Sequence, residues 1–356
     1  MSDTATTTAP TAQFTSVSLF KKRLKRFKTI KRGYYSFYII VTAYILSFFC
    51  PMLMNYKALA VRYEGNMYFP IFKYYPAATF GQTLYGEANY RDLETQLASK
   101  PGDWVIMPLY PYGPLESLTD PSSEPPNKPS MGHWFGTDDR GRDVFVRLAY
   151  GFRISLTFAL ISMTVAYIIG ISVGAMLGYF GGKVDLFGQR VIEIWSSIPF
   201  LYTVMIISSI IRPNFFLLVF LICIFGWMGM TYFIRGEFYR EKAKDYVHAA
   251  LAMGATDRKI VFKHILPNAL TPVIALGPFH IVADIGSLVS LDFLGFGLPP
   301  PTPSWGELIG QGSHNIFSWW LVIFPFGALF VTLLLVVFIG EAVREAFDPR
   351  VYSRLR

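Results

Sequence analysis

The sequence predicts an all-α integral membrane protein with six transmembrane helices and a large insert between the first two. Its composition is the first reason: apolar residues make up 53% of the 356 residues and charged residues only 16%, against about 25% charged in soluble domains. The second reason is that the chain contains six apolar segments near the length of about 20 residues that a membrane-spanning helix needs. A soluble enzyme, a disordered protein and a disulfide scaffold are excluded.

Five of the six predicted spans contain no charged residue, and the remaining one is interrupted by His280, Asp284 and Asp292. The predicted spans are residues 34–54, 154–180, 194–211, 213–234, 266–296 and 316–340. The last five would form a membrane core at 154–340. An even number of spans places both termini on the same side of the membrane.

Lysine and arginine indicate which side that is, because the loops richest in them stay in the cytoplasm. Of the 32 such residues, 21 fall on the side that holds both termini. We therefore expect a basic cytoplasmic tail at 1–33, a cytoplasmic loop at 235–267 and a cytoplasmic tail at 341–356. The basic run 21–32 is interpreted mainly as a topology anchor, with contact to anionic lipids as the alternative. The net charge of +8 is thus a topology signal and does not indicate nucleic-acid binding.

Residues 55–153 are predicted to form an insert on the periplasmic face and a segment that leads into the second span. The stretch 55–132 contains ten prolines and many tyrosines, which indicates an ordered aromatic lobe followed by an extended linker. A spacer and a docking or gating element at the outer mouth are equally compatible with this composition. The two cysteines, Cys50 and Cys223, both lie in apolar segments and give the lobe no disulfide.

Three glycines in the second span, Gly170, Gly174 and Gly178, recur at four-residue spacing. They share one helical face and permit the close approach of another helix, as small-residue patterns do in membranes. We interpret them as helix-packing residues.

The cytoplasmic loop after the fourth span has the pattern helix, glycine, helix, proline. Residues 237–253 are rich in helix formers, and Gly254 is expected to take the left-handed conformation that ends a helix. A second short helix is expected from Thr256 to His264, with Pro267 as its stop. Such a helical hairpin is suited to docking into another protein, and the alternative is an ordinary interfacial helix.

At this loop the sequence resembles a known family. The spacing Ala249-Ala250-x3-Gly254-x9-His264-x-Leu266-Pro267 is similar to the "EAA" loop of ABC-importer permeases. The resemblance implies that this loop, Ala255 included, inserts into a cleft of an ATPase subunit. His248 stands where the family has its glutamate.

Five further matches, in the family's order, resemble dipeptide and oligopeptide permeases of the C type, and most of all the microcin C and oligopeptide uptake branch. These matches are Gly136-Thr-Asp-Asp-Arg-Gly-Arg-Asp143 with Arg147-Leu-Ala-Tyr-Gly-Phe-Arg-Ile-Ser-Leu156, Gly178-Tyr-Phe-Gly-Gly-Lys-Val-Asp185, Leu291-Asp-Phe-Leu-Gly-Phe-Gly-Leu-Pro-Pro300, Pro303-Ser-Trp-Gly306 and Glu341-Ala-Val-Arg-Glu-Ala-Phe-Asp-Pro-Arg350.

The resemblance implies the fold of a type I ABC importer permease in the bacterial inner membrane. It also implies three kinds of partner: a second, homologous permease chain, two ATPase domains and a periplasmic peptide-binding protein. The chain contains no Gly-x4-Gly-Lys-Ser/Thr phosphate loop, so ATP and Mg are expected on the ATPase partners, with no cofactor on this chain.

The polar residues of the fifth span, His280, Asp284 and Asp292, are candidates for the translocation pathway, because charged groups in a membrane face a cavity or a partner. A stabilising His280–Asp284 pair is the alternative, and Asp292 could instead cap the bend that follows it. The same pair motivates a rival function, a proton-coupled secondary transporter. A membrane-embedded enzyme is disfavoured, because the five histidines are scattered and form no metal-ligand cluster. The expected function is a permease subunit, not an enzyme, that moves peptides by alternating access.

Overall fold

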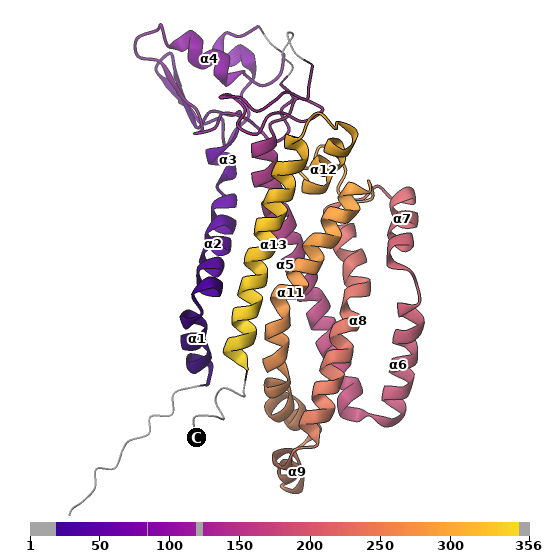
Figure 1. Ribbon diagram of the computed structural model, residues 1–356. Coiled ribbons are helices and arrows are strands. Elements are labelled where there is room, and N and C mark those ends of the chain that lie inside the picture. Colours follow the sequence, from indigo (N-terminus) through magenta and orange to yellow (C-terminus); the bar gives the residue numbers. More distant parts are fainter. Residues whose placement is uncertain (1–18, 84, 119–123, 349–356) are drawn as a thin grey trace, which may run out of the picture.

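The computed structural model describes residues 19–83, 85–118 and 124–348. It consists of a bundle of long helices with a small lobe on one end, and both termini of the described chain leave the bundle at the opposite end (Figure 1). The predicted tails at 1–18 and 349–356 lie outside the described residues.

Four helices of the described chain are long and apolar enough to cross a membrane: Val144–Phe180, Phe215–Lys242, Asp257–Phe293 and Trp320–Phe347. They correspond to α5, α8, the continuous α10–η2–α11 segment, and α13. A fifth crossing is formed if α6 (Gly182–Ser196) and α7 (Phe200–Ile210), which are bent by 63°, count as one span. The first predicted span corresponds to α2 (Lys31–Ser47), of 17 residues, and the short α3 (Cys50–Leu53). The count of six therefore stays a prediction.

Several helices do not begin or end where the predicted spans do. Helix α5 begins at Val144, because the Asp143 side chain accepts a hydrogen bond from the Val146 amide at 2.9 Å and caps the helix. Helix α6 begins directly after Gly181, so the loop expected before the third span is helical instead. That span is broken before Pro199, whose ring cannot continue the helix. At the other end, α13 continues into the predicted tail as far as Phe347.

Helices α5 and α8 approach each other at the three glycines of α5. A Cβ atom on Gly170 would lie 2.7 Å from the carbonyl oxygen of Trp227, and one on Gly174 would lie 2.6 Å from that of Thr231. A Cβ atom on Gly178 would lie 2.8 Å from the carbonyl oxygen of Arg235. The two backbones are therefore in contact along three turns, which only glycine permits.

Helix α13 lies beside α2 on one side and α11 on the other (Figure 1). The contact with α2 is also a close one, since a Cβ atom on Gly33 would lie 2.1 Å from the Cβ atom of Ala342. At the lobe end, the buried rings of Trp305 and Trp320 belong to the same apolar core as α5 and α11. Trp305 lies in α12 (Trp305–His314), a short helix between α11 and α13.

The insert contains a small sheet, which the all-α prediction did not include. Its order is β2-β1-β3, with both pairs antiparallel. The strands are β1 (Ala60–Tyr63), β2 (Asn66–Tyr68) and β3 (Trp104–Ile106). Strands of three or four residues carry too little alternation to be recognised in a sequence. The turn between β1 and β2 has positive φ at Glu64 and Gly65, as tight hairpins require.

An aromatic core supports this lobe. The ring of Phe80, at the end of η1 (Ala77–Phe80), meets four tyrosine rings at steep angles, and Leu93 of α4 (Tyr90–Leu97) is buried in the same cluster. The four tyrosines are Tyr63, Tyr68, Tyr75 and Tyr90. Such edge contacts suit aromatic rings and allow a small lobe to pack without a disulfide.

Candidate functional site

The cytoplasmic loop leaves the bundle as a separate short helix. The continuous helix expected at 237–253 is wrong, because α8 ends at Lys242 and α9 (Asp245–Ala252) begins after an extended Lys244. Gly254 has a φ of 77°, the left-handed conformation expected for it. The chain then returns through α10 (Asp257–Lys259). Helix α9 projects beyond the bundle at the end opposite the lobe (Figure 1).

The expected stop at Pro267 is also wrong. A π-helical segment, η2 (Ile260–Ile265), runs directly into α11 (Leu266–Phe293), with Pro267 in the first turn of α11. Proline has no N–H group and its ring crowds the preceding turn. A π-helical turn is wider than an α-helical one, so it makes room for this ring without ending the helix.

Buried groups fasten α9 to the bundle. Val247 and Ala250 face inward and are buried. The carboxylate of Glu241 is buried as well and accepts hydrogen bonds from Lys244 Nζ at 2.6 Å and from Tyr246 OH at 2.7 Å. Burial and the bond to Glu241 raise the pKa of Tyr246. The helix therefore has a defined position on the bundle.

Two further bonds connect this loop with the end of α5. Tyr179 OH donates to Asp257 Oδ1 at 2.5 Å, and Lys242 Nζ donates to the carbonyl oxygen of Tyr179 at 2.5 Å. Asn268 Nδ2, in the first turns of α11, donates to Tyr246 OH at 3.1 Å. The loop is therefore hydrogen-bonded to the end of α5 and to the first turns of α11, and it follows directly on α8.

The outward side of α9 and its turn is apolar. Met253 is 81% exposed, and Leu251 is exposed beside it. The residues singled out from the sequence divide between the two sides of the loop. Ala250 is buried, Ala255, His264 and Leu266 are half-buried, and Ala249, Gly254 and Pro267 are exposed. An exposed apolar turn on a helix that is held against the bundle is suited to docking into another protein, and we call α9 and this turn the docking element.

We expect Tyr246→Phe to loosen α9, because the hydroxyl lies between Glu241 and Asn268 and its loss removes hydrogen bonds worth about 1–3 kcal/mol. Amide hydrogen exchange in residues 245–252 should become faster. The matched control is Tyr232→Phe, whose hydroxyl has no hydrogen-bond partner among the described residues. Equal rates of amide hydrogen exchange in residues 245–252 of the two variants would show that the Tyr246 hydroxyl does not hold α9 in place.

A polar cluster lies inside the bundle between α5, α8 and α11. His280 Nε2 is 3.8 Å from Asp284 Oδ1, and the ring of Tyr167 stands edge-on to that of His280 at 5.3 Å. Asp284 is 5% exposed. Three atoms of this region have no hydrogen-bond partner among the described residues: Asp284 Oδ2, Tyr167 OH and Ser162 Oγ. An unsatisfied carboxylate at this depth is costly and marks a functional candidate.

Asp292 belongs to a different arrangement. Its Oδ1 accepts from the Leu298 amide at 2.6 Å, and its Oδ2 accepts from Ser304 Oγ at 2.5 Å. Ser304 in turn caps α12 by accepting from the Glu307 amide at 3.2 Å. Both oxygens are thus used to shape the loop after α11, which favours the capping interpretation over the pathway one.

Sequence reasoning missed a buried ion-pair cluster between α5 and α12. Arg142 pairs with Asp138 at 2.7 Å and with Glu307 at 3.1 Å, and Arg147 pairs with Glu307 at 2.5 Å. Burial alone would lower the pKa of Arg142, but the two ion pairs outweigh it and raise that pKa. The sequence indicated only that Arg147, in the first turn of an apolar helix, requires some partner, and it did not indicate which one.

A second set of bonds joins the insert to the start of α5. The Asp143 side chain accepts from Tyr110 OH at 2.8 Å and lies 2.7 Å from His133 Nδ1, in addition to capping the helix. Burial and this carboxylate raise the pKa of Tyr110. The lobe is therefore fixed to the bundle.

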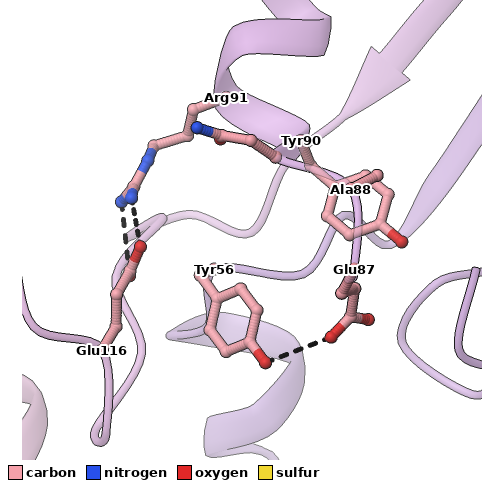
Figure 2. Close-up of a pocket in the computed structure, with 7 residues that line it drawn as sticks. Tyr56, Glu87, Ala88, Tyr90, Arg91 and Glu116 are labelled. Carbon is pink, nitrogen blue, oxygen red and sulfur yellow. Dashed lines mark hydrogen bonds and ion pairs between the residues drawn. The ribbon is translucent and has the colours of Figure 1, made fainter. Parts of the chain in front are cut away.

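The lobe contains a cavity of about 210 Å³. Figure 2 shows Tyr56, Glu87, Arg91 and Glu116 around it. Both acids have basic partners, since Lys57 lies 2.8 Å from Glu87 and Arg91 pairs with Glu116. Burial, together with Glu87, raises the pKa of Tyr56 to about 12. In the described part of the chain, no group of three or more metal-ligating side chains is placed to hold an ion.

Comparison with known proteins identifies the family. The family described as "binding-protein-dependent transport system inner membrane component" matches residues 166–353. The chain belongs to this family. It is 42% identical to the inner membrane ABC transporter permease protein YejE of Escherichia coli over 328 residues, which cover 92% of this chain and 96% of that protein.

Two other relatives carry more specific names. The permease is 38% identical to the peptidoglycan transport system permease protein YejE of Agrobacterium fabrum, over 93% of each chain. It is 31% identical to the dipeptide transport system permease protein DppC of Bacillus subtilis, over 75% of this chain and 86% of that protein.

These matches confirm the resemblance seen in the sequence and the fold class it implies, a mostly helical ABC importer permease. They also confirm that the chain is a transport subunit of the inner membrane and not itself an enzyme.

Proposed function

We propose that this permease is the membrane subunit of an ATP-driven importer of peptides or peptide-like compounds. Its relatives' names include dipeptide and peptidoglycan transport. The observation that carries the proposal is α9, whose exposed apolar turn at Leu251 and Met253 is fixed to the bundle by Glu241 and Tyr246. A docking element of this kind suits a separate, moving ATPase.

Its partners would be those that the sequence predicts. Two ATPase domains, carrying ATP and Mg, would bind α9 on the cytoplasmic face, where both termini of this chain also lie. A second, homologous permease chain would complete the path, and a periplasmic peptide-binding protein would deliver substrate at the lobe end. Closure of the ATPase domains would move α9, and with it α5, α8 and α11, through the bonds at Tyr179 and Tyr246. Such a movement shifts access between two states.

Within the path, His280 and Asp284 remain candidates for contact with the peptide. Asp284 is buried between α5 and α11, so contact with substrate requires these helices to separate. Asp292 is left out of the proposed path, because both of its oxygens serve the loop after α11.

The decisive experiment places charges on the docking turn. Leu251→Asp with Met253→Asp should abolish co-purification of the ATPase subunits that are co-expressed with the permease. Uptake should fall by at least roughly tenfold, since burying an unpaired charge costs several kcal/mol. Both side chains are exposed, so the variant should fold.

The matched control is Leu109→Asp, an exposed apolar residue of the lobe at the opposite end of the bundle, which should leave co-purification of the ATPase subunits unchanged. ATPase subunits that still bind the charged variant would overturn the assignment of α9. Uptake driven by a proton gradient, with no ATPase present, would instead support the rival secondary transporter.

A further inference from the structure

Helix α1 (Leu19–Thr29) has two different basic faces. The arginines face the protein: Arg23 Nη1 donates to Thr271 Oγ1 of α11 at 3.3 Å, and its guanidinium lies over the ring of Phe347 at 4.9 Å from the ring centre. Arg26 pairs with Glu345 of α13 at 3.3 Å. Planar guanidinium groups suit such stacked and paired positions better than lysine does.

Three of the four lysines of α1 face the other way. Lys21, Lys25 and Lys28 recur at i, i+4 and i+7, which places them on one helical face. Because an α-helix rotates by about 100° per residue, this face lies roughly opposite Arg23. All three side chains are exposed, and none has an ion pair or hydrogen-bond partner in the part of the chain that the structure describes. We call these three residues the lysine stripe.

The neighbouring residues place the stripe at the membrane surface. Helix α1 is followed almost directly by α2 (Figure 1). In the first turns of α2, the side chains of Tyr35, Phe37 and Tyr38 are exposed on the outside of the bundle. Exposed aromatic residues collect at the level of the lipid headgroups. Lys28 precedes Tyr35 by two helical turns, about 10 Å, which brings the end of the stripe to the phosphate layer.

We propose that the lysine stripe binds the headgroups of anionic phospholipids in the leaflet at this end of the bundle. Lysine is a flexible point charge that suits a fluid phosphate layer, whereas the paired arginines suit fixed protein partners. The proposal identifies this leaflet as the cytoplasmic one, which rests on the proposed orientation.

The lipid contact has a consequence for the bundle. Arg23 joins α1 to the first turns of α11, close to Asn268, which bonds to Tyr246 of α9. Arg26 joins α1 to the last turns of α13. Lipids that hold the outer face of α1 therefore brace the end of the bundle to which the docking element is attached.

The test compares three forms of the full chain: the parent, Lys21→Gln with Lys25→Gln and Lys28→Gln, and the same three positions changed to arginine. Each is purified in nanodiscs of mixed phosphatidylglycerol and phosphatidylcholine. Native mass spectrometry then measures the ratio of the two lipids that stay bound. The glutamine form should retain at least roughly fivefold less phosphatidylglycerol relative to phosphatidylcholine, since one lysine near an anionic surface contributes about that factor.

The arginine form should keep the parent ratio, because it keeps the charge. A control with two exposed lobe lysines changed, Lys73→Gln with Lys100→Gln, should also keep it. An unchanged ratio in the glutamine form, or an equal loss in the lobe control, would overturn the proposal. A nanodisc presents lipid on both sides and contains no ATPase, so this result does not depend on the proposed orientation or function.

Discussion

An Arg147→Met variant is expected to melt far below the parent protein. Arg147 is fully buried and its guanidinium donates to Glu307 at 2.5 Å and to the carbonyl oxygens of Pro114, Pro301 and Thr302 at 3.0, 3.3 and 3.2 Å. Methionine fills similar space but leaves these acceptors without their donor. Removal of one partner from a buried ion pair costs about 3–5 kcal/mol, which corresponds to a fall of roughly 5–15 °C in apparent melting temperature for a chain of this size.

The measurement is thermal unfolding in detergent, followed by tryptophan fluorescence. Arg140→Gln is the matched control: Arg140 lies 3.7 Å from the same Glu307 but is 49% exposed, and exposed pairs contribute about 0–1 kcal/mol. The melting temperature of Arg147→Lys should lie between those of the two variants. Lysine keeps the positive charge but lacks the planar guanidinium group, which donates several hydrogen bonds at once. If Arg147→Met melts together with the Arg140→Gln control, the cluster does not stabilise the fold.

The pairing within this ion-pair cluster could not be predicted from the sequence. The bundle could be predicted, because runs of apolar residues and the distribution of lysine and arginine are local signals. Arg142, Arg147 and Glu307 meet across more than 150 residues of sequence, and no local pattern records such a pairing. Asp292 is a similar case, since its partners Leu298 and Ser304 identify it as a capping residue only once the loop after α11 is folded.

The structure of the cytoplasmic loop at 235–267, the docking loop, was predicted only in part. Gly254 could be recognised because a left-handed residue after a helix is nearly always glycine. Pro267 was misjudged, because the π-helical segment η2 before it gives its ring room and the helix continues. The break between α8 and α9 was also missed, since Lys244 and Ala243 have no strong preference against a helix.

A Gly174→Val variant should disrupt the contact between α5 and α8. The Cβ atom would lie 2.6 Å from the carbonyl oxygen of Thr231 and 3.0 Å from Ile234 Cβ. The backbone oxygen cannot rotate away as a flexible side chain could, so the two helices must separate. Overpacking of this kind costs about 1–3 kcal/mol or more. It acts on an interface that, in lipid, is held largely by close packing of small residues.

The same change should reduce uptake, because Tyr179 and Lys242 at the ends of these two helices hold the docking loop. Gly229→Val is the matched control: it lies in the same helix pair, and a Cβ atom there would have nothing within 4 Å. Apparent melting temperature and uptake should fall in Gly174→Val and stay near the parent values in Gly229→Val. A parallel loss in both variants would mean that valine itself, and not the closeness of α5 to α8, is responsible. The three glycines would then no longer be evidence that this contact transmits movement from the docking loop.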